Sequence, residues 1–172
     1  MGESKTEIPG LGRAMPPSRT PAAQMPPLQI PPLHVSLITL GVTDLARSIA
    51  FYEALGLVRR VKAAVGVAFF QAGGVVLSLY PRHDLAADAG VVDGRPGVFG
   101  GIALACNRQS RAEVDTTLIR AVAAGGRGLR PAQPAVWGGY SGYVTDPDGH
   151  PWEIAHNPGF PLDEEGRISL PD

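Results

Sequence analysis

The chain has little that would tie it to an oxidising compartment, to nucleic acid or to a membrane. Cys106 is its one cysteine, so neither an internal disulfide nor a cluster of thiolate metal ligands can form. The 15 basic and 16 acidic side chains nearly cancel, whereas DNA and RNA binding needs a basic surface. No apolar run reaches the roughly 18 residues of a membrane span, and no secretory pattern precedes the core. We therefore expect a single-domain cytoplasmic protein whose partners are small molecules or proteins, with no nucleic acid and no membrane among them.

Proline, by contrast, is abundant near the N-terminus, where eight of the 17 prolines fall within residues 1–32. This stretch has neither a helical nor a strand period, which predicts a disordered arm. Two origins stay open for it: an extension ahead of a later start at Met15 or Met25, or an arm that lies on a neighbouring subunit. Residues 161–172 carry four acidic side chains against one basic side chain, which predicts a solvated tail. The compact core is then 33–160.

The first half of this core, residues 33–81, contains one helix among strands. A strand is predicted over 34–42, and Asp44 follows at the N-cap position of a helix that reaches Leu55. Two short β-prone runs then flank a Gly-Gly pair at 73–74, which predicts a hairpin.

The same order of elements returns in residues 97–160, after an irregular connection at 82–96. A strand is predicted over 100–106, and Ser110 with Glu113 forms a capping box that begins a helix. A hairpin with an Asp-Pro-Asp-Gly turn completes the second half. The sequence therefore predicts two copies of one structural unit, each with strands and a single helix.

Strand alternation predicts two unlike faces in each half. One face is branched and apolar and suits packing under a helix, whereas the other has smaller side chains. The first face carries Ile38, Leu40, Val42, Ile102, Leu104 and Cys106, and the second carries Leu37, Thr39, Gly41, Gly101, Ala103 and Ala105. Two such small-sided faces predict a cup that side chains do not fill.

Two motifs, at Leu37–Leu57 (LITLGVTDLARSIAFYEALGL) and Tyr143–Ile154 (YVTDPDGHPWEI), make the chain resemble the vicinal oxygen chelate superfamily. That superfamily includes glyoxalase I, extradiol dioxygenases and bleomycin-resistance proteins. The resemblance implies an α+β fold of two βαβββ modules that form a half-barrel cup, resembling glyoxalase and bleomycin-resistance proteins, and a homodimer. It covers essentially the whole core.

The resemblance also implies four metal-ligand positions, which fall on Leu37, Ser78, Gly101 and Glu153. A divalent ion needs three or more N, O or S donors, and only Glu153 is an ordinary ligand. Enzymatic activity is therefore left undecided by the sequence, and no metal or other cofactor is expected.

The four histidines do not restore the missing donors. We expect the following positions: His34 on the face away from the cup, His83 in an exposed loop, His150 at the rim of the sheet and His156 on the face that packs on a helix. Cys106 is expected to be a buried small hydrophobe rather than a nucleophile. The arginines that flank the loops are expected to be solvated: Arg82, Arg95, Arg127 and Arg130.

The candidate ligand site gathers side chains that strand parity directs into the cup. Glu153 alternates with Trp152 and Ile154, so it faces the cup, where it could be a general base, bind a basic ligand or accept a hydrogen bond. One of Tyr140 and Tyr143 is expected to lie beside it, because three residues separate them. The other predicted ligand-binding residues are Trp137 as a stacking platform, Phe69 and Ser78.

Three hypotheses follow. The first is metal-independent binding of a small apolar or aromatic, and even cationic, molecule between Trp137, one tyrosine and Glu153. The second is a divalent-metal-dependent lyase, isomerase or dioxygenase, in which Glu153 and another donor such as His83 hold the ion. The third is a structural or regulatory dimer whose cup is vestigial and filled by Leu37 and Val76.

Overall fold

The computed structural model describes residues 33–94, 98–168 and 170, of which His34 onward forms one compact unit. The predicted arm at 1–32 and the predicted solvated position of Arg95 lie outside the described residues. None of the helices in the described part of the chain has the length and apolar character needed to cross a bilayer.

The first module has the strand, helix and hairpin that its sequence predicts. The elements are β1 (Leu37–Val42), α1 (Leu45–Ala54), β2 (Arg59–Arg60), β3 (Ala68–Ala72) and β4 (Val75–Pro81). Helix α1 begins after Asp44, whose side chain accepts a hydrogen bond from the Arg47 backbone N–H at 3.0 Å. It ends ahead of Gly56, which has a φ of +96° that glycine adopts without a Cβ clash.

The connection at 82–96 contains a short helix, α2 (Arg82–Asp88), that the sequence did not predict. No side chain caps its N-terminus, where Pro81 stands, so the usual start signal is missing. The Arg82 guanidinium instead donates to Asp93 at 2.7 Å and to the Gly94 carbonyl at 2.9 Å. These bonds fold the residues after α2 back onto its first turn.

The second module repeats the order of the first. Its elements are β5 (Leu104–Asn107), α3 (Arg111–Ala123), β6 (Arg127–Pro134), β7 (Tyr140–Thr145) and β8 (Pro151–His156). The prediction of a strand over 100–106 was wrong at its start, because Gly101 has a φ of +82° and pairing begins only at Leu104. The Ser110 cap of α3 is confirmed by a hydrogen bond from the Glu113 backbone N–H at 3.3 Å.

Each module forms a four-stranded sheet of the same topology. Sheet A has the order β1-β4-β3-β2 and sheet B the order β5-β8-β7-β6, with one parallel pair in each. Thr39 lies beside Ser78 in sheet A, and Ala105 lies beside Glu153 in sheet B. The expected α+β fold of two repeated modules is therefore confirmed.

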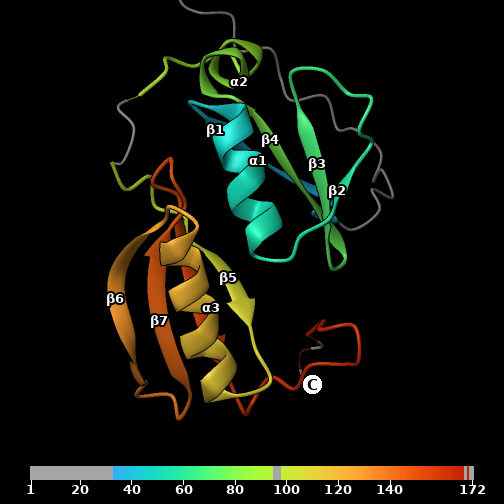
Figure 1. Cartoon of the computed structure of the whole chain (residues 1–172). Coiled ribbons are helices and arrows are strands. Elements are labelled where there is room, and N and C mark those ends of the chain that lie inside the picture. The colour runs from blue at the N-terminus through green and yellow to red at the C-terminus, as the bar shows by residue number, and fades with distance from the viewer. Residues whose placement is uncertain (1–32, 95–97, 169, 171–172) are drawn as a thin grey trace, which may run out of the picture. The chain divides into compact units, whose positions relative to one another are not determined.

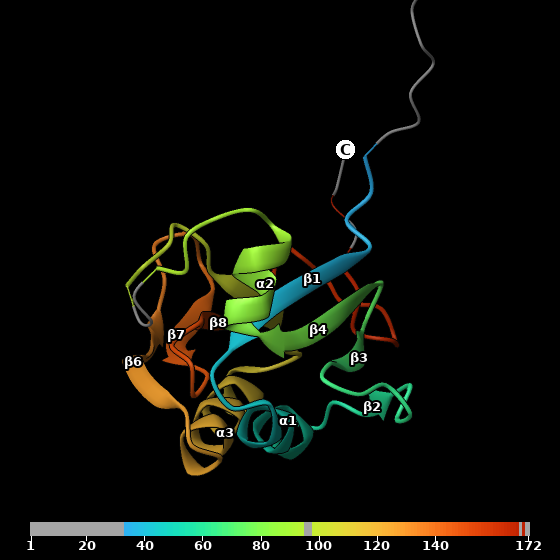
Figure 2. The ribbon, with the colours of Figure 1, turned by 90° about the horizontal axis from the view of Figure 1, so that it is seen from above.

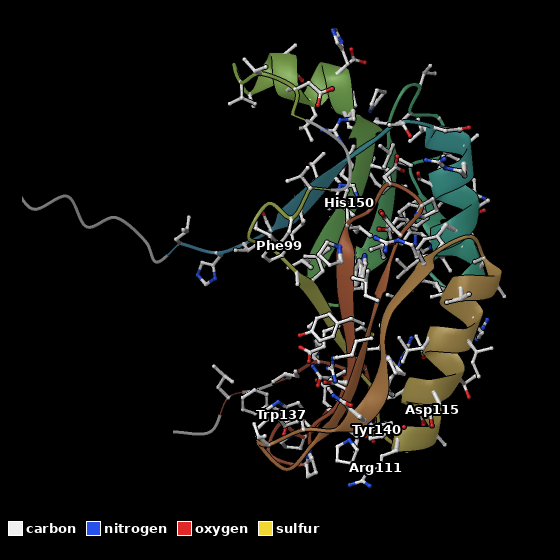
Figure 3. The ribbon with its side chains drawn as sticks, turned by 90° about the vertical axis from the view of Figure 1, so that its left-hand side faces the viewer. Phe99, Arg111, Asp115, Trp137, Tyr140 and His150 are labelled. Atoms are coloured by element: carbon white, nitrogen blue, oxygen red, sulfur yellow. The ribbon has the colours of Figure 1, made fainter. Side chains whose placement is uncertain are left out.

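Helices α1 and α3 pack on the same side of the two sheets (Figures 1 and 3). The buried core on that side includes Leu40, Phe51, Phe70, Leu79 and Val144. The opposite side, called the far face below, carries the strand residues of the other parity. Helix α2 covers part of the far face of sheet A, on the side away from α1 and α3 (Figure 2). It packs closely there, since a Cβ on Gly41 would lie 2.9 Å from the Arg82 Cβ.

The Asp-Pro-Asp-Gly turn joins the second module to the first. Asp148 accepts hydrogen bonds from the Thr43 backbone N–H at 2.8 Å, the Ser48 hydroxyl at 2.7 Å and the Arg47 guanidinium at 2.9 Å. Asp146 accepts a hydrogen bond from the Tyr52 hydroxyl at 2.8 Å. Both carboxylates are thus held by the first and last turns of α1, about 100 residues earlier in the chain.

Candidate ligand-binding face

The far face of sheet B brings Tyr143 and Glu153 together. They are register partners on the neighbouring strands β7 and β8, and both side chains are half-buried. Burial raises the pKa of the Tyr143 phenol, and the nearby charge of Glu153 raises that pKa further. The phenol therefore stays protonated at neutral pH and can donate a hydrogen bond.

Arg130 extends this pair into a cluster of three charged or polar side chains. Its guanidinium carbon lies 5.0 Å from the centre of the Tyr143 ring, and it donates to the Ser141 hydroxyl at 2.9 Å. A cation at this distance from a ring is attracted by the negative face of the π-system. The sequence predicts that Arg130 is solvated, but this side chain is half-buried and belongs to the candidate site.

The far face of sheet A holds the other predicted pair, Ser78 and Phe69. They are register partners on β4 and β3, and Ser78 is buried. Phe70, the neighbour of Phe69, packs against Tyr52 of α1 and so lies on the other side. Predicted site residues therefore occupy the equivalent strands of both sheets.

Tyr140 does not share the face of Tyr143. Its hydroxyl donates to Asp115 of α3 at 2.9 Å, and the Arg111 guanidinium lies 5.5 Å from its ring centre. Figure 3 shows Arg111 and Asp115 beside it. This packing against α3 removes Tyr140 from the candidate site, since the two tyrosines are three residues apart on one strand.

Trp137 lies in the turn that joins β6 to β7, at the end of sheet B away from His150 (Figure 3). Its ring packs over Gly139, where a Cβ would overlap the ring carbons, and the side chain is 47% exposed. A flat, half-exposed ring is suited to stacking, but it stands at the end of the strands rather than beside Glu153.

The positions that the family resemblance assigns to metal ligands do not form a ligand set. Ser78 and Glu153 lie on the far face, Leu37 lies on the same face two residues before Thr39, and Gly101 precedes β5. Glu153 is the one carboxylate among them. Within the described residues no three His, Cys, Asp or Glu side chains lie together as metal ligands would. These residues therefore do not fit a divalent ion.

His150, His156 and Cys106 hold structural positions. His34 and His83 are exposed, and His150 Nδ1 lies 2.8 Å from Asp146. His156 Nδ1 lies 3.1 Å from the Arg108 carbonyl oxygen, on the helix side. Cys106 is also on the helix side, where burial raises the pKa of its thiol.

Two hollows of the structure involve the helices that pack on the sheets, and the first of them also borders Arg130 and Tyr143 of the candidate site. One is a groove between α3 and β6, where Ile119, Val122 and Leu129 contribute apolar side chains. The other is a cavity between the modules on the helix side. Sequence parity could not locate either hollow, because both depend on how helices and loops from different parts of the chain meet.

Comparison with known proteins gives the same fold. A sequence model described as the Glyoxalase/Bleomycin resistance protein/Dioxygenase superfamily matches residues 34–154. The chain therefore belongs to this superfamily. Comparison with curated proteins gives no match.

Among solved structures, a glyoxalase-related enzyme from Fulvimarina pelagi is 42% identical, with a TM-score of 0.73 over 80% of this chain and 97% of that one. A lactoylglutathione lyase from Agrobacterium tumefaciens is 28% identical, with a TM-score of 0.56 over 74% of this chain and 96% of that one. A glyoxalase/bleomycin resistance protein/dioxygenase family enzyme from Burkholderia phytofirmans PsJN is 16% identical and shares the fold, with a TM-score of 0.63 over 70% of this chain and 96% of that one.

Proposed function

We propose that the protein binds a small aromatic molecule on the far face without a metal ion. The carrying observation is the cluster of Tyr143, Glu153 and Arg130, which places a hydrogen-bond donor, an acceptor and a cation on one sheet. The residues at the superfamily's metal-ligand positions supply one carboxylate. They therefore do not form a ligand set for a metal ion to which the bound molecule would also coordinate. Glu153 favours a ligand with a positive group, and Tyr143 supplies an aromatic surface.

A homodimer would complete this site. Val98, Phe99 and Ile102, in the segment before β5, are each about 70% exposed, and Val35 ahead of β1 is 62% exposed. Large exposed apolar side chains of this kind are typical of surfaces that another protein covers. Light scattering should give twice the 18.0 kDa chain mass, and a mass of one chain would contradict the dimer. The cytoplasmic location stays a prediction, to be tested by cell fractionation.

The metal-free part of the proposal is tested by elemental analysis. The purified protein, and the protein reloaded with Zn²⁺, Ni²⁺ or Mn²⁺ and passed through a desalting column, should carry far less than one ion per chain. Retention of about one ion per chain would overturn this part and favour the metal-dependent alternative. Lactoylglutathione lyase activity would then be assayed first, because one of the similar structures carries that name.

The role of Glu153 is tested with two probes that share a ring and differ in charge, 2-phenylethylamine and phenylacetate. Calorimetric titration should show tighter binding of the amine. Glu153→Gln should weaken its binding by about tenfold, the loss of one charge-assisted contact. Glu53→Gln, at an exposed position of α1, is the matched control and should change nothing. Equal binding of the amine by Glu153→Gln and the unchanged protein would contradict the proposal.

A further inference from the structure

A cavity of about 670 Å³ lies between the two modules on the side of α1 and α3. Its apolar wall comes from the end of α1 and from the helix side of sheet B, and includes Phe51, Leu55, Trp152 and Ile154. Figure 1 shows these elements, with the turn between β3 and β4 and the C-terminal segment nearby. A volume of roughly 300–1,000 Å³ with mostly apolar walls is typical of small-molecule sites.

Arg108 brings an uncompensated polar group to this wall. Its backbone is fixed, because its N–H donates to the Ala155 carbonyl at 2.7 Å. Its side-chain Nε, however, is buried and has no hydrogen-bond partner. A buried donor without a partner costs free energy that a bound acceptor would recover. The Arg108 charge also acts on the neighbouring thiol, since it lowers the pKa of Cys106 against the larger effect of burial.

The second arginine of the cavity is already neutralised. Arg167 donates to Asp163 at 2.8 Å and to Glu165 at 2.9 Å, within the C-terminal turn that forms part of the wall. These two carboxylates more than neutralise Arg167 and leave the turn negative, so Arg108 is the cation that an anionic group in the cavity would meet.

We propose that this cavity binds an amphiphile with an apolar body and one carboxylate, whose carboxylate pairs with Arg108. The apolar body would lie against Phe51, Trp152 and Ile154. A planar guanidinium binds a carboxylate with two parallel hydrogen bonds, and Arg108 lines the cavity where such a group would lie. This site differs from the one proposed above, because Glu153 and Tyr143 alternate with the residues of this wall and face the other side of sheet B.

Cys106 allows the proposal to be tested without knowledge of the natural ligand. It is the sole cysteine of the chain and it lines the cavity, so its reaction with a thiol reagent reports on occupancy. Decanoate and decanol serve as probes with the same chain and different head groups, below the micelle concentration of decanoate. Decanoate should slow the labelling of Cys106 saturably, with one molecule bound per chain, and decanol should protect far less.

Arg108→Met is the decisive variant, because it removes the charge and keeps much of the side-chain volume. It should weaken protection by decanoate at least about tenfold and leave protection by decanol unchanged. Arg60→Met, at an exposed position, and Glu153→Gln should both retain the affinity of the unchanged protein for decanoate. Thermal unfolding of each variant verifies that the fold is intact.

Three results would overturn the inference. One is labelling of Cys106 that decanoate does not slow, and another is equal protection by decanoate in Arg108→Met and in the unchanged protein. The third is tighter decanoate binding in Glu153→Gln, because relief of charge repulsion by this substitution would assign the probe to the far face. Failure of the amine titration above leaves these outcomes unaffected, because that experiment probes the other side of the sheet.

Discussion

Asp148 connects the two modules more directly than any other single side chain described above. Burial alone would raise its pKa, but hydrogen bonds from Thr43 and Ser48 and the charge of Arg47 outweigh burial and hold the pKa below its ordinary value of 3.8. The carboxylate is therefore charged at neutral pH and has partners for both oxygens. Removal of it would leave the Ser48 hydroxyl buried without its acceptor.

The first prediction at this scale is that Asp148→Ala lowers the free energy of unfolding by about 3 kcal/mol, as expected when one partner of a buried charged network is lost. Urea denaturation followed by far-ultraviolet circular dichroism measures it. Asp84→Ala, at an exposed position, is the control and should change stability by no more than about 0.5 kcal/mol. Equal midpoints for the two variants would show that the contact contributes little.

At the scale of elements, the junction between α3 and β6 depends on close backbone packing at Gly126. A Cβ at this position would lie 2.4 Å from the Thr145 carbonyl oxygen and 2.9 Å from the Ala121 carbonyl oxygen. Neither oxygen can move without breaking its own element. At Gly128, two residues later, a Cβ would meet only the Val122 side chain, at an ordinary 3.9 Å.

Gly126→Ala should therefore destabilise the protein by about 1–3 kcal/mol or more, the range of overpacking, whereas Gly128→Ala should be close to neutral. Thermal unfolding of the pair, monitored by calorimetry, compares the same chemical change at two neighbouring sites. Similar melting temperatures for the two variants would contradict the packing argument.

The elements that the sequence predicted are those with local signals. Asp44 and Ser110 mark helix starts, and Gly73 and Gly74 mark a hairpin, because each fixes the backbone through its own chemistry. Helix α2 and strand β6 were not predicted. Helix α2 has no capping side chain, and β6 contains two prolines and two arginines, so its strand conformation depends on pairing with β7.

The candidate site was predictable to the same degree. Alternation along β8 was enough to set Glu153 apart from Trp152, and spacing on β7 was enough to separate Tyr140 from Tyr143. Arg130 could not be assigned, because β6 has register shifts on both sides of it that a regular alternation does not describe. The cavity near Arg108 was also beyond the sequence, since its walls come from both modules.

At the scale of the whole molecule, the contact between the modules contributes to the pH dependence of stability. Below pH 3.8 the unfolded chain binds a proton at Asp148 that the folded chain does not hold, so stability falls as the pH falls through the lowered folded pKa. Tyr52 affects the stability at alkaline pH. Burial and then the charge of Asp146 raise its pKa well above 10, so stability is full below pH 10 and is lost at higher pH.

We predict that Tyr52→Phe removes part of the alkaline loss while the acid loss remains, and that Asp148→Asn does the reverse. Urea unfolding at a series of pH values from 3 to 11 measures both slopes, with the unchanged protein as reference. Parallel pH profiles for the three proteins would assign the dependence to groups outside the contact.

The long sequence separation within this contact has a consequence for synthesis. As the chain leaves the ribosome, Ser48 and Tyr52 emerge about 100 residues before the carboxylates that accept their hydrogen bonds. Until the last hairpin has been synthesised, these hydroxyls of the first module have no carboxylate acceptors, and α1 has no contact with the second module. During that interval the nascent chain is most exposed to aggregation and to chaperone binding. The interval ends when the Asp-Pro-Asp-Gly turn is synthesised and its carboxylates bind the first module.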